Sequence, residues 1–297
     1  MRNRLCLFRL APAFLLALLA GGCVPGVPKS VKCDANLEYA RIGSEPLLLD
    51  IYEPKGATNK LPVLIYIHGG SWASGSKDPC PIAFIATQHL AIVSINYRLS
   101  NEAHYPAQLY DCKGAVRWLR ANADKYNLDA AHIGLAGVSA GGHLAALMGT
   151  TAGVAELEGD VGGNLDQSSR VQAVCAFYPP TDLDKLVNKP ELRRSSETEV
   201  AKFLGGPLES KLDVAALANP VRYASSNSAP FFIMHGAKDP LVSVEQSRLL
   251  YEALKKAGAK VQFEVVPGGH GIIAPPRVAK EIYQFYQTYL VTAPPPA

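Results

Sequence analysis

The sequence has no excess of positive charge that would suit a polyanionic partner. Charged residues make up only 19% of the 297 positions, and the formal net charge is +3. Three arginines, Arg2, Arg4 and Arg9, lie in an N-terminal segment without acidic residues, so the chain from residue 23 onward has 26 Lys and Arg against 26 Asp and Glu. A neutral body lacks the basic stripe that binds nucleic acids or anionic membranes. We therefore expect neither partner for it.

Cysteine is also scarce, at six residues in the chain. The four beyond Cys23 are Cys33, Cys80, Cys112 and Cys175, and none of them has the Cys-x-x-Cys or Cys/His spacing of a zinc site. They are too few for a disulfide scaffold, and we predict no metal. Cys175 lies in an apolar strand and is predicted to be a core residue. Cys80 and Cys112 each lie near the start of a predicted helix after one of two neighbouring strands, which leaves a disulfide between them open.

No apolar run is long enough to cross a membrane. The run Leu10–Ala20 has 11 residues, whereas a spanning helix needs about 20. It follows a basic stretch and precedes Gly21-Gly22-Cys23, which predicts a signal peptide over residues 1–22. Two small residues before a cysteine resemble a bacterial lipoprotein signal, although Leu19 stands one place further upstream than usual. We expect an exported chain, anchored through a lipid on Cys23 and facing the periplasm or cell exterior. Ordinary secretory cleavage nearby is the alternative.

The apolar content of 48%, with 25 glycines and 22 prolines, excludes a disordered chain or a coiled coil. Short β-branched runs alternate instead with helical stretches. The predicted strands are 36–42, 46–53, 62–67, 91–96, 133–136, 171–178, 230–235 and 261–266, and the predicted helices are 81–88, 107–123, 140–150, 243–257 and 275–290. This alternation predicts an α/β fold, with a mostly parallel sheet and helices on both faces.

We expect a single domain over 36–290, preceded by a Pro-rich tether over 23–35 and followed by a tail over 291–297. Two polar segments rich in Pro, Gly and Ser interrupt the alternation, at 152–170 and 180–229. Long insertions of this kind usually carry function. We expect both to wall a substrate pocket.

A candidate nucleophile lies between a predicted strand and a predicted helix. Gly137-Val138-Ser139-Ala140-Gly141 fits the pattern G-x-S-x-G. The sharp turn there lifts the serine hydroxyl clear of the sheet at the N-terminus of the helix. The sequence therefore predicts Ser139 as a nucleophile.

A serine nucleophile needs a histidine base and a carboxylate that orients it, which follow in the order Ser, Asp, His in this type of sheet. Asp239 follows the predicted strand 230–235, and His270 follows the strand 261–266. Two successive strands thus deliver the acid and the base to the edge that carries Ser139. Asp182 and Asp184, after the strand 171–178, remain alternatives for the acid. Among the other histidines, His143 is expected to make a structural hydrogen bond and His235 to be a packing residue.

The strand 62–67 ends in His68-Gly69-Gly70-Ser71-Trp72. Small residues here let backbone N–H groups face a reacting carbonyl, and one such donor is typically worth about 10²–10³ in rate. We predict an oxyanion hole formed by the N–H groups of Gly70, Ser71 and Ala140. Trp72 and Tyr178, at the same edge, are predicted to bind substrate, with a purely core role as the alternative.

Four motifs carry a family resemblance: His68–Trp72, Asn96–Leu99, Tyr105–Gln108 and Gly137–His143. Together they resemble the α/β-hydrolase esterases of the hormone-sensitive-lipase-like group, from about residue 36 to 290. The likeness is closest to the branch that contains acetylxylan and feruloyl esterases. Ser71 stands where lipase relatives carry a third glycine, and too few residues separate Cys23 from the first strand for the N-terminal helical cap of the lipase-like branch.

This resemblance implies a serine carboxylic-ester hydrolase without a cofactor. Its substrates would be short-chain acyl esters, including acetylated or feruloylated carbohydrates. The stretch around Asp239 and His270 also resembles prolyl-oligopeptidase-type peptidases, although the chain has no room for their gating domain. A non-catalytic binding protein on a hydrolase fold is a further alternative, and the complete set of catalytic residue types argues against it.

Overall fold

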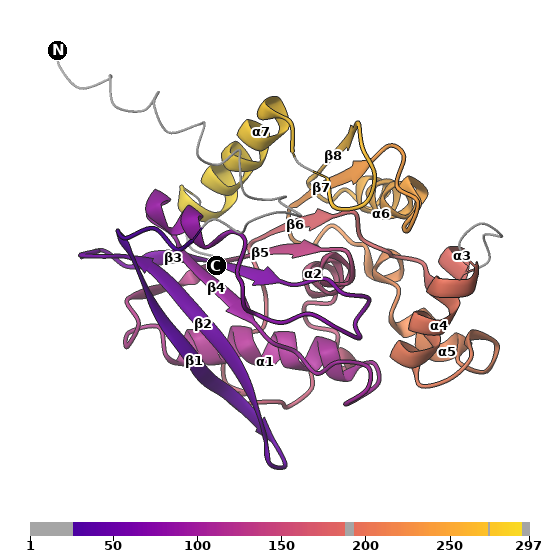
Figure 1. The fold of residues 1–297 in the computed structure, drawn as a ribbon, viewed down its shortest axis with the longest axis horizontal. Coiled ribbons are helices and arrows are strands. Elements are labelled where there is room, and N and C mark those ends of the chain that lie inside the picture. The colour runs from indigo at the N-terminus through magenta and orange to yellow at the C-terminus, as the bar shows by residue number, and fades with distance from the viewer. Residues whose placement is uncertain (1–25, 188–192, 273, 293–297) are drawn as a thin grey trace.

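The computed structural model describes residues 26–187, 193–272 and 274–292. Within these ranges eight strands form one sheet in the order β1-β2-β4-β3-β5-β6-β7-β8 (Figure 1). The strands are β1 (Val31–Ile42), β2 (Glu45–Pro54), β3 (Leu61–Ile67), β4 (Ala91–Ile95), β5 (Leu128–Val138), β6 (Ala173–Phe177), β7 (Phe231–Gly236) and β8 (Val261–Val266). The pairs β1–β2 and β2–β4 are antiparallel, and every other pair is parallel. The predicted mostly parallel sheet is confirmed.

Helices cover both faces of the sheet, as predicted. One face packs against α1 (Ala107–Ala121), α2 (Ala140–Thr150) and α6 (Val244–Lys256), and the other against the short helix η2 (Ala83–Gln88) and α7 (Pro276–Tyr286), which η6 (Gln287–Val291) extends. Alternate residues of β3 show the two cores, because successive side chains of a strand point to opposite faces. Val63 and Ile65 pack in the first cluster, and Leu64 and Tyr66 in the second.

The tether predicted over 23–35 is wrong at its C-terminal end. Strand β1 begins at Val31, and its first residues pair with the end of β2, with Val31 opposite Pro54. The Lys32 ammonium lies 2.7 Å from the carboxylate of Glu53, whose side chain is buried. Polar composition suggested a loop here, but backbone pairing and this ion pair hold the segment as an edge strand.

The disulfide left open between Cys80 and Cys112 is not formed. Both thiols are buried and free. Cys80 belongs to the cluster with η2 and α7, whereas Cys112 belongs to the cluster with α1 and α2. The sheet therefore lies between them. Cys175 is fully buried, as predicted.

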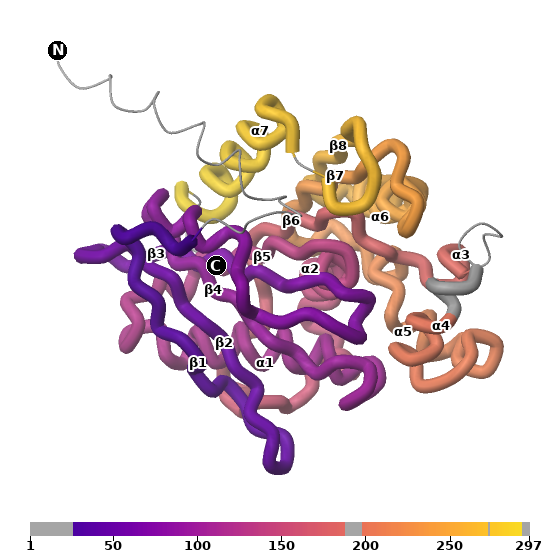
Figure 2. Tube along the Cα trace, in the orientation of Figure 1, coloured from indigo at the N-terminus to yellow at the C-terminus, as the bar shows by residue number. Residues whose placement is uncertain are grey.

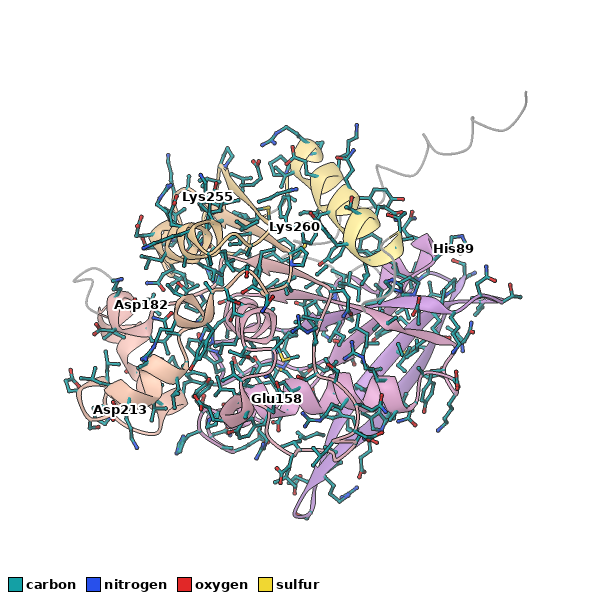
Figure 3. The ribbon with its side chains drawn as sticks, turned by 180° about the vertical axis from the view of Figure 1, so that it is seen from behind. His89, Glu158, Asp182, Asp213, Lys255 and Lys260 are labelled. Carbon is teal, nitrogen blue, oxygen red and sulfur yellow. The ribbon has the colours of Figure 1, made fainter. Side chains whose placement is uncertain are left out.

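The segment 152–170 does not lie near the ends of the parallel strands where a pocket forms. Helix α2 has 11 residues and so carries the chain roughly 16 Å away from Ser139. The segment packs on α1 instead, where the buried Lys113 ammonium donates to Glu158, at 2.7 Å, and to the Thr151 carbonyl. Figure 3 labels Glu158 beside this helix. The expectation that 152–170 walls the pocket was wrong, because α2 ends at the opposite ends of the parallel strands from Ser139.

The segment 180–229 does extend from the pocket edge. It carries α3 (Leu183–Val187), α4 (Arg193–Leu204) and α5 (Leu212–Leu217), together with the short turns η4 (Leu208–Ser210) and η5 (Pro220–Tyr223). Figures 1 and 2 show these helices grouped beyond the end of β6. Among the described residues, no helix is both long and apolar enough to cross a membrane.

Candidate active site

Ser139 occupies the turn between β5 and α2. Its backbone has φ 52° and ψ −120°, a strained conformation for a residue with a side chain. The Ser139 N–H donates to the Phe177 carbonyl at 2.9 Å. Glycine is required beside it, because a Cβ on Gly141 would lie 2.1 Å from the Ile67 carbonyl oxygen. The close contact between this turn and the end of β3 thus selects small residues around the serine.

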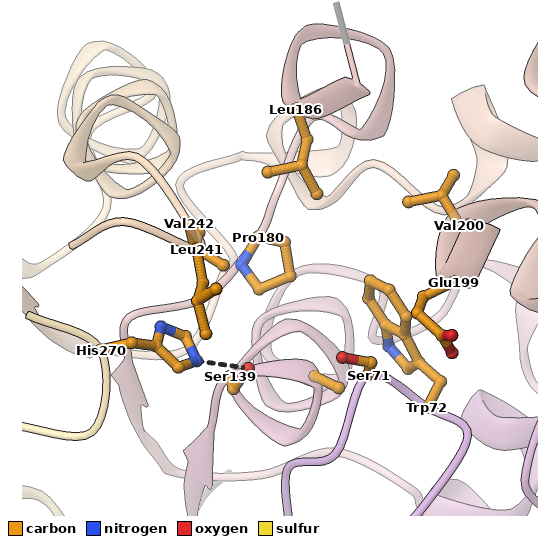
Figure 4. A pocket seen from close by; sticks show the side chains of 11 residues that line it. Ser71, Trp72, Ser139, Pro180, Leu186, Glu199, Val200, Leu241, Val242 and His270 are labelled. Carbon is orange, nitrogen blue, oxygen red and sulfur yellow. Dashed lines mark hydrogen bonds between the residues drawn. The ribbon is translucent and has the colours of Figure 1, made fainter. Parts of the chain in front are cut away.

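The structure brings Asp239 and His270 to Ser139. The two residues follow β7 and β8, whose parallel pairing places both strand ends at one edge of the sheet. The Ser139 hydroxyl donates to His270 Nε2 at 2.9 Å (Figure 4), and His270 Nδ1 donates to Asp239 Oδ2 at 2.7 Å. A hydroxyl, an imidazole and a carboxylate in this relation can activate the oxygen as a nucleophile.

The Asp239 carboxylate is buried and fully hydrogen bonded, with no exposed side-chain surface. Its Oδ1 accepts from the backbone N–H groups of Leu241 and Val242, each at 2.9 Å. Burial by itself would raise the pKa of Asp239, but hydrogen bonds from His235, His270 and the Val242 amide outweigh it and lower the pKa well below its ordinary value. The group is therefore a carboxylate at any physiological pH.

His235 contacts this carboxylate, which was not foreseen from the sequence. Its Nε2 lies 3.2 Å from Asp239 Oδ2, and the imidazole is fully buried. It was expected only to pack at the end of β7. The sequence does place Asp239 four residues after His235. At that spacing a tight turn brings the carboxylate back to the end of the strand.

The predicted oxyanion turn is strained and closely packed. Ser71 and Trp72 have φ values of 53° and 59°, in the left-handed region. Ser71 and Ala140 line the cavity that holds Ser139. Ala140 is the first residue of α2, so its N–H has no acceptor within the helix. Gly70 is not among the cavity residues; its carbonyl accepts from the N–H groups of Ala73 and Ser74 and closes the turn.

Trp72 lines the cavity but is also a core residue. Only 3% of it is exposed, and its ring stacks on Phe203 of α4 at a centroid distance of 4.4 Å. The indole N–H donates to His143 Nδ1 at 3.2 Å, and His143 Nε2 in turn donates to the Ala218 carbonyl at 2.6 Å. The structural hydrogen bonding expected of His143 is thus present, and it links the oxyanion turn to the segment 180–229.

Tyr178, predicted to bind substrate, is not among the residues that line the cavity. It lies after β6 and belongs to the cluster with η2 and α7. Its ring packs edge to face on the imidazole of His270, with centroids 4.6 Å apart. The side chain therefore faces the back of the base rather than the cavity.

A cavity of about 180 Å³ opens at Ser139. It is largely apolar and is bounded by the oxyanion turn, the base and the segment 180–229 (Figure 4). The residues that line it are Ser71, Trp72, Ser139, Ala140, Pro180, Leu186, Glu199, Val200, Leu241, Val242 and His270. The sequence analysis did not identify Glu199, Leu186 and Val200 as cavity residues. No sequence motif in their helices indicates how these helices pack against the rest of the chain.

The alternative acids do not reach this site. Asp182 Oδ1 accepts from the Lys185 N–H at 3.1 Å, and Oδ2 pairs with the Lys185 ammonium at the start of α3 (Figure 3). Asp184 is exposed on the same helix. In the part of the chain that the structure describes, no three His, Cys, Asp or Glu residues cluster as metal ligands. Cys23, the predicted lipidation site, lies outside the described residues.

The chain is similar to known proteins in both sequence and structure. The model of the BD-FAE family matches residues 49–254. Esterase LipC of Mycobacterium tuberculosis is 33% identical over 236 residues, which is 77% of this chain and 58% of that protein. The chain thus spans little more than half the length of this curated relative.

Two solved structures resemble the chain over most of its length. A truncated carbohydrate esterase from gut microbiota superposes with a TM-score of 0.79 at 32% identity, covering 88% of this chain and 97% of that one. A bifunctional GH43-CE protein of Bacteroides eggerthii gives a TM-score of 0.77 at 33% identity, covering 86% of this chain and 37% of its own.

We predict that His143 makes the fold less stable in acid. Burial lowers the pKa of His143 from 6.5 to about 4. Below pH 6.5 the imidazole of His143 binds a proton in the unfolded chain but stays neutral in the folded chain. The free energy of unfolding therefore decreases as the pH is lowered, until about pH 4. The loss between pH 7 and 4.5 should be about 2–3 kcal/mol. Urea unfolding at both pH values measures it, with His143→Gln as the control that keeps a donor and an acceptor. Equal losses in both proteins would contradict this role.

Proposed function

Because the chain belongs to the BD-FAE family and has the α/β-hydrolase fold, we propose that it is a serine carboxylic-ester hydrolase. One observation carries the proposal: Ser139, His270 and Asp239 form a hydrogen-bonded series with distances of 2.9 and 2.7 Å, and Ser139 and His270 open onto one apolar cavity. The names of the relatives, an esterase and a carbohydrate esterase, support the same reaction class.

In the proposed mechanism, the Ser139 hydroxyl oxygen attacks the ester carbonyl while His270 Nε2 takes its proton. Asp239 holds the imidazole in the required tautomer and stabilises the imidazolium. The N–H groups of Ser71 and Ala140 stabilise the oxyanion. Gly70 closes the turn that holds Ser71 in place. His270 then protonates the leaving alcohol, and a water activated by the same imidazole releases the acid from Ser139.

The size of the cavity supports a short acyl group. An engineered protein cavity of roughly 150 Å³ holds one benzene molecule, so the cavity of about 180 Å³ has room for little more. A feruloyl group adds a propenoyl linker, a hydroxyl and a methoxy group to such a ring and exceeds it. Of the two carbohydrate esters expected from the sequence, we therefore propose acetylated ones, with the sugar outside the cavity.

We propose further that the chain is exported and anchored through Cys23. The support is the sequence alone: a short apolar run followed by Gly21-Gly22-Cys23. One acyl chain binds a membrane only marginally, so stable anchoring needs the two or three chains of a lipoprotein cysteine.

Within the proposed function, the first prediction concerns the roles of the catalytic residues. Ser139→Ala should fold normally and lower the turnover of p-nitrophenyl acetate by about 10⁴–10⁶. Asp239→Asn should lower it by about 10⁴ through the wrong His270 tautomer, whereas the matched Asp182→Asn should have little effect. Wild-type protein that cleaves aminoacyl nitroanilides better than the acetate ester would point to a peptidase. Activity of Ser139→Ala within tenfold of wild type would remove the serine from the mechanism.

The second prediction concerns acyl length. For p-nitrophenyl esters, kcat/KM should be highest between acetyl and butyryl and fall at least about tenfold by octanoyl. A cavity of about 180 Å³ has no room to bury further CH₂ groups, each worth about 0.8 kcal/mol. Leu186→Ala should move the optimum to longer chains, since Leu186 lines the cavity. Trp72 is a poorer choice, because its indole also holds the oxyanion turn.

Leu241→Ala is the matched control for this series. Leu241 also lines the cavity, but 52% of it is exposed, so its truncation should leave the acyl optimum unchanged. A wild-type optimum at decanoyl or longer would end the short-acyl proposal.

The third prediction concerns location. Wild-type protein expressed in a bacterium that processes lipoproteins should incorporate labelled palmitate and sediment with membranes. Cys23→Ser should lose the label and appear as soluble protein outside the cytoplasm, and Cys33→Ser should behave as wild type. Absence of label from the wild type would make Cys23 incidental.

A further inference from the structure

Two imidazoles share the Asp239 carboxylate. His270 Nδ1 lies 2.7 Å from Oδ2, and His235 Nε2 lies 3.2 Å from the same oxygen. The proposed mechanism uses only the first. The second imidazole and the Ser247 hydroxyl beside it are fully buried, so neither contacts substrate.

The surroundings of His235 determine where its proton lies. Its Nε2 faces two acceptors, the Val242 carbonyl at 2.8 Å and the Asp239 carboxylate. Its Nδ1 lies 2.6 Å from Ser247 Oγ, which can donate. Nε2 therefore carries a proton, and the N–H is shared between the carbonyl and the carboxylate. Ser247 holds this tautomer in place.

We infer that His235 is a positioning residue that weakens the basicity of His270 by competing for the charge on Asp239. The inference rests on the proposed function for its catalytic consequence, but not for its structural basis. Asp239 Oδ1 is occupied by two backbone N–H groups, so the two imidazoles share the remaining charge at Oδ2. A second donor on Oδ2 partly neutralises that charge. The carboxylate therefore stabilises the imidazolium of His270 less than it would with His270 as its only imidazole partner.

Other groups that face the base are not among the hydrogen-bond or ion-pair partners of His235, which are Ser247, Val242 and Asp239. Tyr178 packs on the His270 ring. Glu199 is the other ionisable residue that lines the cavity, and its carboxylate pairs with Lys202 at 3.0 Å. Lys238, next to Asp239 in the chain, is exposed. A shift in the titration of His270 on substitution of His235 therefore reports on the shared carboxylate.

The test compares His235→Leu, which removes the donor, with His235→Gln, whose amide nitrogen can occupy the place of Nε2. The pKa of His270 is measured by NMR titration of its ring protons, and the acidic limb of kcat/KM for p-nitrophenyl acetate is measured in parallel. We expect the Leu variant to raise both by about 0.5–1 unit. Below the limb kcat/KM should fall about three- to tenfold, and the alkaline plateau should stay within a few fold of wild type. The Gln variant should match the wild type.

Ser247→Ala serves as a second variant, because it removes the hydrogen bond to Nδ1 and leaves the imidazole in place. It should give a smaller shift in the same direction, and it keeps the test available if His235→Leu does not fold. An acidic limb and a His270 titration that stay at their wild-type positions, with activity lowered equally at every pH, would reduce His235 to a packing residue. An NMR shift in a protein without esterase activity would instead preserve the inference and overturn the proposed function.

Discussion

The site depends on one buried carboxylate. Asp239 has no exposed side-chain surface and stays ionised because four N–H groups, two from the backbone and two from histidines, donate to it. Leaving such a charge without partners would be strongly destabilising. The loop after β7, the end of that strand and the loop after β8 all converge on it. The position of His270, and through it the hydrogen bond to Ser139, follows from satisfying that charge.

The segment 180–229 has two structural roles that are linked through Trp72. It walls the cavity with Pro180, Leu186 and Val200, and it holds the oxyanion turn through the Phe203 ring and the Ala218 carbonyl. The same helices that limit the size of the acyl group thus also fix the strained turn. Truncating Trp72 would change both together, which is why changes at Leu186 and Leu241 separate pocket size from oxyanion geometry.

Much of this arrangement is predictable from local patterns. Parallel strands end at one edge, so Ser139, Asp239 and His270 could be placed together from the residues that follow three apolar runs. Local patterns do not show in which direction a side chain points, or which residues it contacts, after a turn of the backbone. Tyr178 packs behind the base, His235 turns back onto Asp239, and Glu199 enters the cavity from a helix far away in the sequence. The length of the predicted helix 140–150 does indicate where 152–170 lies, since α2 alone carries this segment away from the pocket. The edge strand at Val31 depends on pairing with β2, which composition cannot reveal.

The central claim is that Ser139 is activated by His270 and not merely adjacent to it. The most direct measurement is peptide mapping by mass spectrometry after treatment with a fluorophosphonate, which reacts with serines activated by a base. A single adduct should be found on the peptide containing Ser139, it should form much more slowly in His270→Ala, and unfolding the protein before treatment should abolish it. No adduct on the folded protein, or one on another residue at the same rate in His270→Ala, would contradict the assignment of this site as a serine hydrolase centre.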